Sequence, residues 1–352
     1  MKLGIQVHMP ARKVADVCKT IEDAGLDSAW SPGVDPGTGH YAEYAHMLSV
    51  TERIDIGGAI IPAFQASPLA HARAAIFLQE VYNGRFILGF GSQTKGLIRT
   101  QLGREYVKPA QMVKEVIEIV KAVTHNQGDR IQYGGEFFSI NMRGSGASRR
   151  PTFPPAPIYL AAVNKLNLRV TGQVCDGLIG HPIYPPRYLR DFAIPRVELG
   201  LADTGRSRTD VDICAMPMTW IAETPGEREE AFHRGRVNLG NYFTTRAYWT
   251  FLELLGWSKV REDIEKVVQN SPYGGPFDTN ELEKCIPDEI VEEVCLIGTP
   301  EEVRRKAKER YDGVADTLLF YMLGGGPDTS EGDPAKEETH YRVIDAFKTY
   351  ER

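Results

Sequence analysis

The stretch TERIDIGGAIIPAFQASPLAHARAAIFLQEVYNGRFILGFGSQ, residues 51–93, holds two short apolar segments on either side of a longer one. The segments IDIGGAII (54–61) and FILGFG (86–91) are rich in branched and aromatic residues, which predicts strands. Between them, Ser67 stands as a helix N-cap before Pro68, which predicts a helix over 67–82. A strand, a helix and a strand in this order predict two parallel strands joined by a right-handed crossover.

The same alternation extends in both directions. Further strands are predicted at 3–7, 27–30, 157–163, 176–181, 212–222 and 317–323, with helices at 11–24, 40–51, 109–125, 165–174, 186–203, 301–311 and 335–350. A small hairpin around Gly134-Gly135 is predicted over 131–140, and a mostly helical insertion over roughly 225–290.

This order predicts an α/β fold, a (β/α)8 TIM barrel with a helical insertion before the last βα unit. We expect one domain over residues 1–352. The alternative is a doubly wound sheet, but the first βα turn lacks the GxGxxG pattern of its dinucleotide-binding version.

Composition excludes several classes of function. A net charge of −6 without a Lys/Arg block argues against a nucleic-acid surface. The start MKLGIQVHMPARKV has no apolar core of a signal peptide, and no apolar run reaches the roughly 18 residues of a membrane span. The five cysteines form no CxxC pair, which predicts reduced, mostly buried thiols. Together these features predict a cytoplasmic protein.

In a (β/α)8 barrel the active site is built at the C-terminal ends of the strands. Those ends carry few carboxylates here, and no His, Asp and Glu cluster has metal-ligand spacing, so we expect no metal. No GxSxG nucleophile motif occurs either. A site of small residues, amides and aromatics suits a bound cofactor that carries the chemistry.

Motifs at these strand ends give the chain a family resemblance. AGLDSAW (24–30), the opening stretch 51–93, APIYLAAVNKLNLRVTGQVCDGLIGHP (156–182) and LIGTPEEVRRKAKERYDGVADTLLFY (296–321) resemble, in consistent order, the bacterial luciferase-like monooxygenase family. GSQTKGLI (91–98) and RAYWTFLELLGW (246–257) resemble its coenzyme F420-dependent oxidoreductase branch. The resemblance covers effectively the whole chain.

The resemblance implies a cofactor site. A non-proline cis peptide in the third strand, against which the flavin-type ring rests, corresponds to Ala59–Ile60; a plain barrel strand is the alternative. The turn that approaches the cofactor's polar edge or its side chain corresponds to Gly91, Ser92 and Gln93. The phosphate-binding loop and helix start correspond to Ala161, Ala162, Asn164 and Lys165, where helix N–H groups and a lysine would meet the phosphate. A solvated lysine is the alternative for Lys165.

The chain also departs from the family pattern. Members with a histidine after the second strand have an Asp-His pair there, whereas this chain has Ser31-Pro32-Gly33-Val34. A glutamate and a lysine of the sugar-phosphate dehydrogenases correspond to Thr94 and Tyr184, which argues against glucose 6-phosphate as substrate.

Two further residues are candidates. His181 is the ionisable group left at a strand end, either catalytic or held for structural reasons beside Pro182. Trp30 either forms a wall of the cofactor site or belongs to the core.

The resemblance implies hydride transfer between coenzyme F420 and a small alcohol, carbonyl compound or activated alkene. The alternatives are an FMN-dependent two-component monooxygenase, supplied by a separate reductase that regenerates the reduced cofactor, and a non-catalytic flavin-binding protein. The expected partners are a small-molecule substrate and a second copy of the chain in a homodimer, with no nucleic acid and no membrane.

Overall fold

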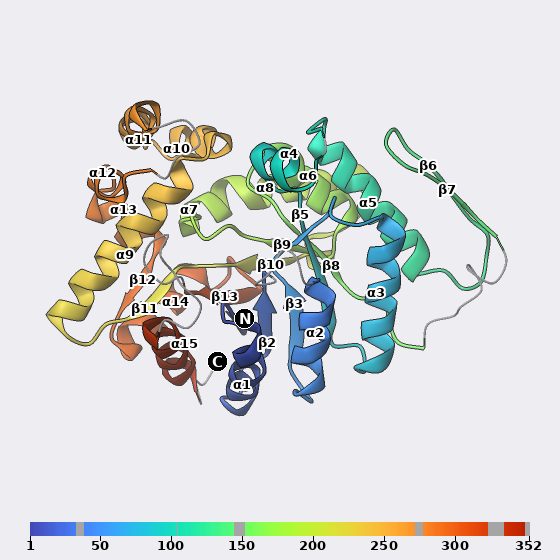
Figure 1. Cartoon of the computed structure of the whole chain (residues 1–352), viewed down its shortest axis with the longest axis horizontal. Coiled ribbons are helices and arrows are strands. Elements are labelled where there is room, and N and C mark those ends of the chain that lie inside the picture. Colours follow the sequence, from blue (N-terminus) through green and yellow to red (C-terminus); the bar gives the residue numbers. More distant parts are fainter. Residues whose placement is uncertain (33–38, 104, 144–151, 272–276, 323–333, 349–352) are drawn as a thin grey trace.

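Eight parallel strand positions close into a barrel surrounded by helices (Figure 1). The computed structural model describes residues 1–32, 39–103, 105–143, 152–271, 277–322 and 334–348. Around the barrel the strand order is β3-β2-β1-β13-β10-β9-β8-β5-β4, and pairing of β3 with β5 closes the circle. The predicted (β/α)8 barrel is therefore confirmed. Its strands are β1 Lys2–Gln6, β2 Ser28–Ser31, β3 Asp55–Gly58, β4 Ile61–Pro62, β5 Phe86–Gly91, β8 Ile158–Ala161, β9 Gly177–Ile179, β10 Asp212–Ala215 and β13 Thr317–Tyr321.

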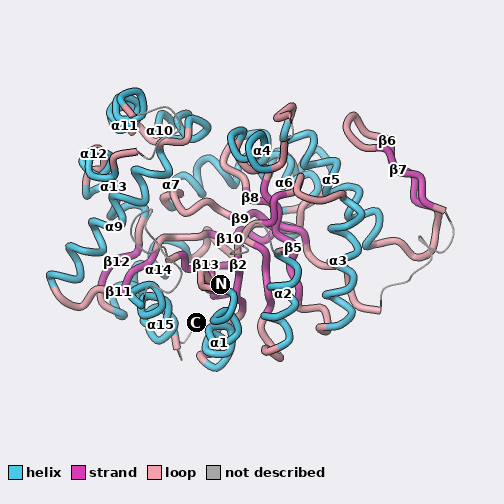
Figure 2. The backbone as a smooth tube through the Cα atoms, viewed as in Figure 1, coloured by secondary structure: helices cyan, strands magenta, loops and turns pink. Residues whose placement is uncertain are grey.

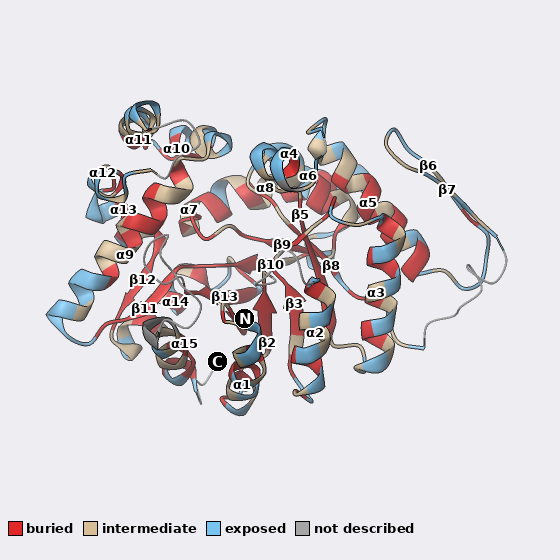
Figure 3. Ribbon diagram, in the orientation of Figure 1, coloured by how far each residue is buried: buried red, intermediate tan, exposed pale blue. Residues whose placement is uncertain are grey.

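Helices cover the outside of the barrel and bury their apolar faces against the strands (Figures 2 and 3). Ser67 caps α3 as predicted, because its side chain accepts a hydrogen bond from the Ala70 N–H. The hairpin β6 Ile131–Gly134 and β7 Ser139–Met142 projects away from the barrel. The surrounding helices are α1 Ala11–Asp23, α2 His40–Ser49, α3 Pro68–Val81, α5 Pro109–Thr124, α6 Lys165–Val174, α7 Pro186–Tyr188 with α8 Ile194–Thr204, α14 Pro300–Tyr311 and α15 Pro334–Phe347.

Two of the predicted strands were wrong in extent. The segment 54–61 is divided into β3 and β4 at Ala59–Ile60. The segment 212–222 is divided into β10 and β11 (Thr219–Ile221) around Pro217, which has no N–H to continue a strand ladder. β11 pairs with β12 (Leu296–Gly298) outside the barrel. The short helix α4 (Lys95–Gln101), capped by Thr94, was not predicted.

The helical insertion lies between β11 and β12. In Figure 1 its helices lie on the left side of the barrel, and the β6–β7 hairpin lies on the right side. The structure places it at Pro225–Val294, close to the predicted 225–290. The insertion consists of α9 Pro225–Phe243, a 3-10 turn Arg246–Tyr248, α10 Trp249–Leu254, α11 Ser258–Asn270, α12 Thr279–Lys284 and α13 Asp288–Val294.

Two large aromatic rings occupy the barrel interior. Trp30 and Tyr159 lie with ring centroids 5.4 Å apart, and both are buried. Glycines make room for them: a Cβ on Gly57 would lie 2.2 Å from the Trp30 ring, and one on Gly177 would lie 2.4 Å from the Tyr159 ring. The barrel interior around these rings is therefore a packed core. We expect the active site beyond it, at the C-terminal ends of the strands.

Three aspartates, Asp27, Asp176 and Asp316, stabilise the N-terminal end of the barrel. Each precedes a strand and accepts a hydrogen bond from a backbone N–H at the start of a neighbouring strand, at 2.7–2.8 Å, from Leu3, Ile158 and Ile213 respectively. These carboxylates pair groups that the parallel ladder leaves open at this end. They act in stability, at the end of the barrel opposite the expected active site.

Substitution of Gly89 in β5 tests the close contact between this strand and the break between β3 and β4. A Cβ there would lie 1.7 Å from the Gly58 carbonyl oxygen, a backbone atom that cannot swing aside. We expect Gly89→Ala to lower the free energy of unfolding by about 3 kcal/mol or more, measured by urea titration. Gly134→Ala, where no atom lies within 4 Å of the added Cβ, is the control and should change stability by less than about 0.5 kcal/mol. Equal stabilities of the two variants would contradict the contact.

Candidate active site

The C-terminal mouth of the barrel has two chemically different halves. On one side, small residues end the neighbouring strands: Gly91 pairs with Ala161 in register, and Ala59 lies at the break between β3 and β4. On the other side, polar side chains end β1 and β13, where Gln6 pairs with Tyr321. The small half consists of strand ends without large side chains, and the polar half offers hydrogen bonds.

The Ala59–Ile60 peptide is cis, as the family resemblance implied. The Ala59 N–H donates to the Ser31 carbonyl at 2.8 Å, and the Gln6 amide donates to the Ala59 carbonyl at 3.0 Å. Gly91 permits close packing here, because a Cβ on it would lie 2.4 Å from the Ile60 side chain. β1, β2 and β5 thus fix the backbone at the break.

Gln6 was not singled out from the sequence. The residue is 4% exposed, and its Oε1 has no hydrogen-bond partner among the described residues. A buried acceptor without a donor is unfavourable by about 1–3 kcal/mol, so this atom is suited to receive a donor from a ligand. The available signal was a lone polar residue at the C-terminal end of an otherwise apolar strand.

The turn after β5 is joined to the helix after β8. The Ser92 hydroxyl accepts a hydrogen bond from the Asn167 amide of α6 at 3.0 Å. Gln93 adopts a left-handed backbone with φ of 55°, and its carbonyl accepts a hydrogen bond from the Tyr106 hydroxyl at 3.4 Å. The structure therefore places Ser92 beside the first turn of α6, with Gln93 next to it in the turn after β5.

Helix α6 begins at the mouth directly after β8. Ala161 ends the strand, Ala162 is buried beside it, Asn164 occupies the N-cap position and Lys165 is the first helical residue. Asn164 does not cap the helix with its side chain; its amide donates to the Ala247 carbonyl of the insertion at 3.3 Å. The first turn contains no acidic residue and Lys165 is exposed, so this end is favourable for an anion.

His181 follows β9 and lies between two tyrosines of the insertion. Its ring makes edge-to-face contacts with Tyr242 and Tyr248, with centroids 4.9 and 4.8 Å apart. Nε2 lies 3.0 Å from the Tyr248 hydroxyl, and Nδ1 accepts a hydrogen bond from the Ile183 N–H at 3.4 Å. Burial lowers the pKa of His181 from its ordinary 6.5 to about 3, so the imidazole is neutral.

Trp30 is 1% exposed and packs inside the barrel, where its indole N–H donates to the Ser28 hydroxyl at 2.9 Å. This environment favours a core aromatic over a wall of the site. Tyr184 is also buried, and its hydroxyl donates to the Ala162 carbonyl, so it supports the β8 loop from below. Gly33 and Val34 lie outside the described residues.

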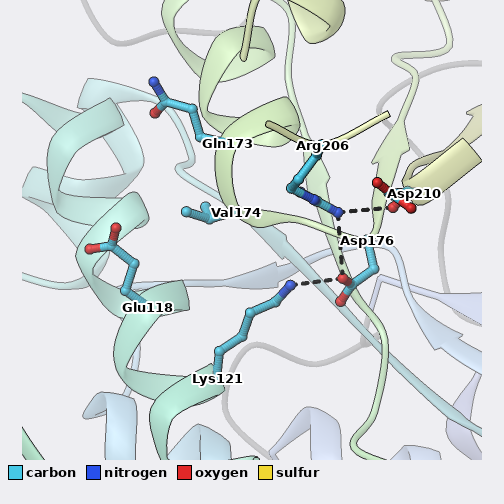
Figure 4. Close-up of a pocket in the computed structure, with 7 residues that line it drawn as sticks. All are labelled: Glu118, Lys121, Gln173, Val174, Asp176, Arg206 and Asp210. Atoms are coloured by element: carbon cyan, nitrogen blue, oxygen red, sulfur yellow. Dashed lines mark hydrogen bonds and ion pairs between the residues drawn. The ribbon is translucent and has the colours of Figure 1, made fainter. Parts of the chain in front are cut away.

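A hollow of different character lies at the opposite end of the barrel (Figure 4). Asp176 precedes β9 there and forms an ion pair with Lys121 at 2.7 Å, while Arg206 lies 3.9 Å from the same carboxylate. These charges neutralise one another, and Asp176 also accepts from the β8 backbone. The hollow is part of the stabilising network and not a second active site.

No group of three or more His, Cys, Asp or Glu side chains in the described part of the chain is placed to hold a metal ion. Within the same residues, no helix is long and apolar enough to cross a membrane. The cysteines are all unpaired, and four of the five are buried.

The fold agrees with the comparisons to known proteins. The sequence profile of the luciferase-like monooxygenase family matches residues 3–317, so the chain belongs to this family. It is 26% identical over 339 residues to a 5,10-methylenetetrahydromethanopterin reductase of Archaeoglobus fulgidus, covering 93% of this chain and 94% of that one.

Solved structures share the architecture. The coenzyme F420-dependent tetrahydromethanopterin reductase of Methanopyrus kandleri superimposes with a TM-score of 0.76 at 19% identity, covering 99% of this chain and 97% of that one. A monooxygenase of Streptomyces bottropensis gives a TM-score of 0.68 at 15% identity, with coverages of 99% and 98%. At these identities the superpositions establish the fold.

The environment of His181 predicts its titration. Because the folded state disfavours the charged ring, the unfolded chain binds more protons below pH 6.5, and this residue makes stability fall as pH drops from 6.5 toward 3. We expect the His181 Cε1–H NMR signal, assigned by its loss in His181→Gln, to show no titration down to pH 5. Stability should also fall less steeply with acid in His181→Gln than in the natural chain. A midpoint near 6.5 would contradict a neutral imidazole whose pKa is lowered by its surroundings.

Proposed function

We propose that this chain is an oxidoreductase that transfers a hydride between coenzyme F420 and a small organic substrate. The observation that carries the proposal is the mouth itself, where the small strand ends Gly91 and Ala161 pair in register and lead directly to the start of α6, whose first turn contains no acidic residue. The Methanopyrus kandleri reductase, which shares this fold, is described as coenzyme F420-dependent, and this supports the choice of cofactor.

The residues present fit a flat ring cofactor with a phosphate. A tricyclic deazaflavin has an imide N–H at its polar edge, and the orphan Oε1 of Gln6 supplies a buried acceptor. Gly91 and Ala161 leave the neighbouring strand ends without large side chains. The phosphate would be held by the first-turn N–H groups of α6, Lys165 and Asn164, with Ser92 and Gln93 at the adjoining turn.

When bound, the deazaflavin supplies hydride chemistry and does not activate oxygen as a flavin does. The chain's own contribution is positioning and electrostatics. The backbone at Ala59–Ile60 supports the ring, Lys165 anchors the charged side chain, and His181 provides a neutral hydrogen-bonding group in a largely buried place. No covalent intermediate with a protein side chain is required.

The second candidate is an FMN-dependent monooxygenase supplied by a separate reductase. The family description favours it, and FMN shares the ring shape and the phosphate. A non-catalytic flavin-binding protein is the candidate from another class, consistent with the few charged groups at the mouth. We retain a homodimer as the proposed assembly, which sedimentation velocity would test.

Direct titration separates these candidates. Purified protein is titrated with F420 and, separately, with FMN while its tryptophan fluorescence is followed. We expect micromolar binding of F420 and much weaker binding of FMN. The reverse order would support the monooxygenase, and F420 binding without turnover of any alcohol, aldehyde or enone in a broad panel would support the binding protein.

Lys165 tests the phosphate site. If its ammonium group contacts phosphate, Lys165→Ala should weaken F420 binding by about 1–3 kcal/mol, or about 5- to 150-fold in Kd. The control is Lys19→Ala, which removes an exposed lysine on α1 and should leave the Kd unchanged. Equal affinities of the two variants would remove Lys165 from the site.

A further inference from the structure

Hydroxyl groups gather on the polar half of the mouth, and the insertion supplies two of the three. Tyr248 comes from the 3-10 turn, Tyr242 from α9 and Tyr321 from the end of β13. The Tyr242 and Tyr321 hydroxyls lie 2.6 Å apart, and both tyrosines of the insertion contact the His181 ring. We call Tyr242, Tyr248, Tyr321 and His181 the tyrosine cap.

The hydrogen bonds of His181 determine where the Tyr248 proton points. Nδ1 accepts from the Ile183 N–H and therefore carries no proton. A neutral imidazole then has its proton on Nε2, which donates to the Tyr248 oxygen at 3.0 Å. The Tyr248 O–H is consequently directed away from His181, and the described residues offer it no other hydrogen-bond partner.

The hydroxyl groups of Tyr242 and Tyr321 also leave one proton without an acceptor among the described residues. One hydroxyl of Tyr242 and Tyr321 donates to the other, so the accepting phenol keeps a proton of its own. Neither phenol has another hydrogen-bond partner among the described residues. The cap therefore presents two O–H donors whose acceptors are not supplied by the described chain.

The exposure of its side chains distinguishes the tyrosine cap from a fully buried aromatic cluster. Tyr242, Tyr248 and His181 are partly exposed, whereas Tyr321 is 7% exposed beneath them. Asn164 joins the same segment to the start of α6 through the Ala247 carbonyl. The 3-10 turn thus lies between the end of β9 and the proposed phosphate site, which places Tyr248 next to the proposed cofactor.

We propose that the tyrosine cap binds the oxygen atom of a neutral alcohol or carbonyl substrate, with Tyr248 as the catalytic hydrogen-bond donor and His181 as its positioning residue. This inference rests on the proposed function. Two neutral donors suit a neutral oxygen, whereas carboxylates and phosphates are typically recognised by Arg or Lys.

The redox step balances with these groups. In the oxidation of an alcohol, the carbon loses a hydride to the oxidised deazaflavin, and the oxygen loses its proton to water, while the Tyr248 O–H stays donated to that oxygen. In the reduction of a carbonyl compound, the hydride is delivered to the carbon and a proton from water to the oxygen. The developing negative charge on the substrate oxygen is stabilised by the two phenol O–H groups.

The first experiment measures binding, not turnover. Dissociation constants are determined for 2-acetonaphthone, a neutral ketone, and for 2-naphthoate, its carboxylate analogue, with the protein in the presence and absence of saturating F420. We expect the ketone to bind more tightly than the carboxylate. Tyr248→Phe should weaken ketone binding about five- to tenfold and leave the F420 Kd unchanged.

Tyr133→Phe is the matched control, because it removes a phenol that donates to Glu118 beside the β6–β7 hairpin. It should alter neither binding constant. Preference for the carboxylate, absence of ketone binding, or equal ketone affinities of Tyr248→Phe and the natural protein would overturn the proposal. Failure of F420 to bind, with the ketone still bound through Tyr248, would instead overturn the cofactor assignment.

The second experiment tests the positioning role of His181. A Gln amide nitrogen can replace Nε2 as donor to Tyr248, whereas an Asn amide corresponds to the Nδ1 position. We expect His181→Gln to retain ketone affinity within about threefold, and His181→Asn to lose about as much as Tyr248→Phe. For reduction of the ketone, Tyr248→Phe should lower kcat about 100-fold or more with a smaller change in KM. Equal behaviour of the Gln and Asn variants would overturn the positioning role.

Discussion

The mouth of this barrel depends on the contact between β5 and the break in the third strand. Gly89 lies against the Gly58 carbonyl, and Gly91 lies against the Ile60 side chain, at distances that exclude any Cβ. The two glycines let the chain leave regular strand geometry at Ala59–Ile60 while the barrel stays closed through β3–β5 and β4–β5 pairing. A backbone surface without bulky side chains results, and the proposed ring site is built on it.

The insertion completes the mouth from the other side. Its described residues contribute no strand to the barrel, yet they provide Tyr242 and Tyr248 and receive the Asn164 hydrogen bond. The barrel thus holds the groups suited to a cofactor, and the insertion supplies groups suited to a substrate. We therefore expect relatives with the same barrel and a different insertion to keep the proposed cofactor site and to differ in substrate.

The sequence predicts most of the fold because its signals are local. Ser67-Pro68 marks a helix start, and the run 86–91 matches β5 in full. The site is harder to predict, because its contacts are long-range. The position of the cis peptide followed from family resemblance, but Gln6 meets Ala59 across 53 residues and His181 meets Tyr248 across 67. No periodicity in the chain encodes such pairs, and the break at Pro217 could have been read from its missing N–H.

The placement of charge along the barrel axis connects stability with function. At the N-terminal end, Asp27, Asp176 and Asp316 accept backbone hydrogen bonds, and Asp176 also pairs with Lys121. Around the tyrosine cap and Gln6, the polar groups of the mouth are a neutral imidazole, phenols and an amide. Charge is carried by Lys165 at the start of α6 and by Glu43, which accepts from the Ser31 hydroxyl at the end of β2. A carboxylate beside a site of hydride transfer would favour charged states and water, whereas neutral donors allow partial desolvation at small energetic cost. Because Asp27, Asp176 and Asp316 serve the opposite end of the barrel, their charges stabilise the fold without entering the tyrosine cap.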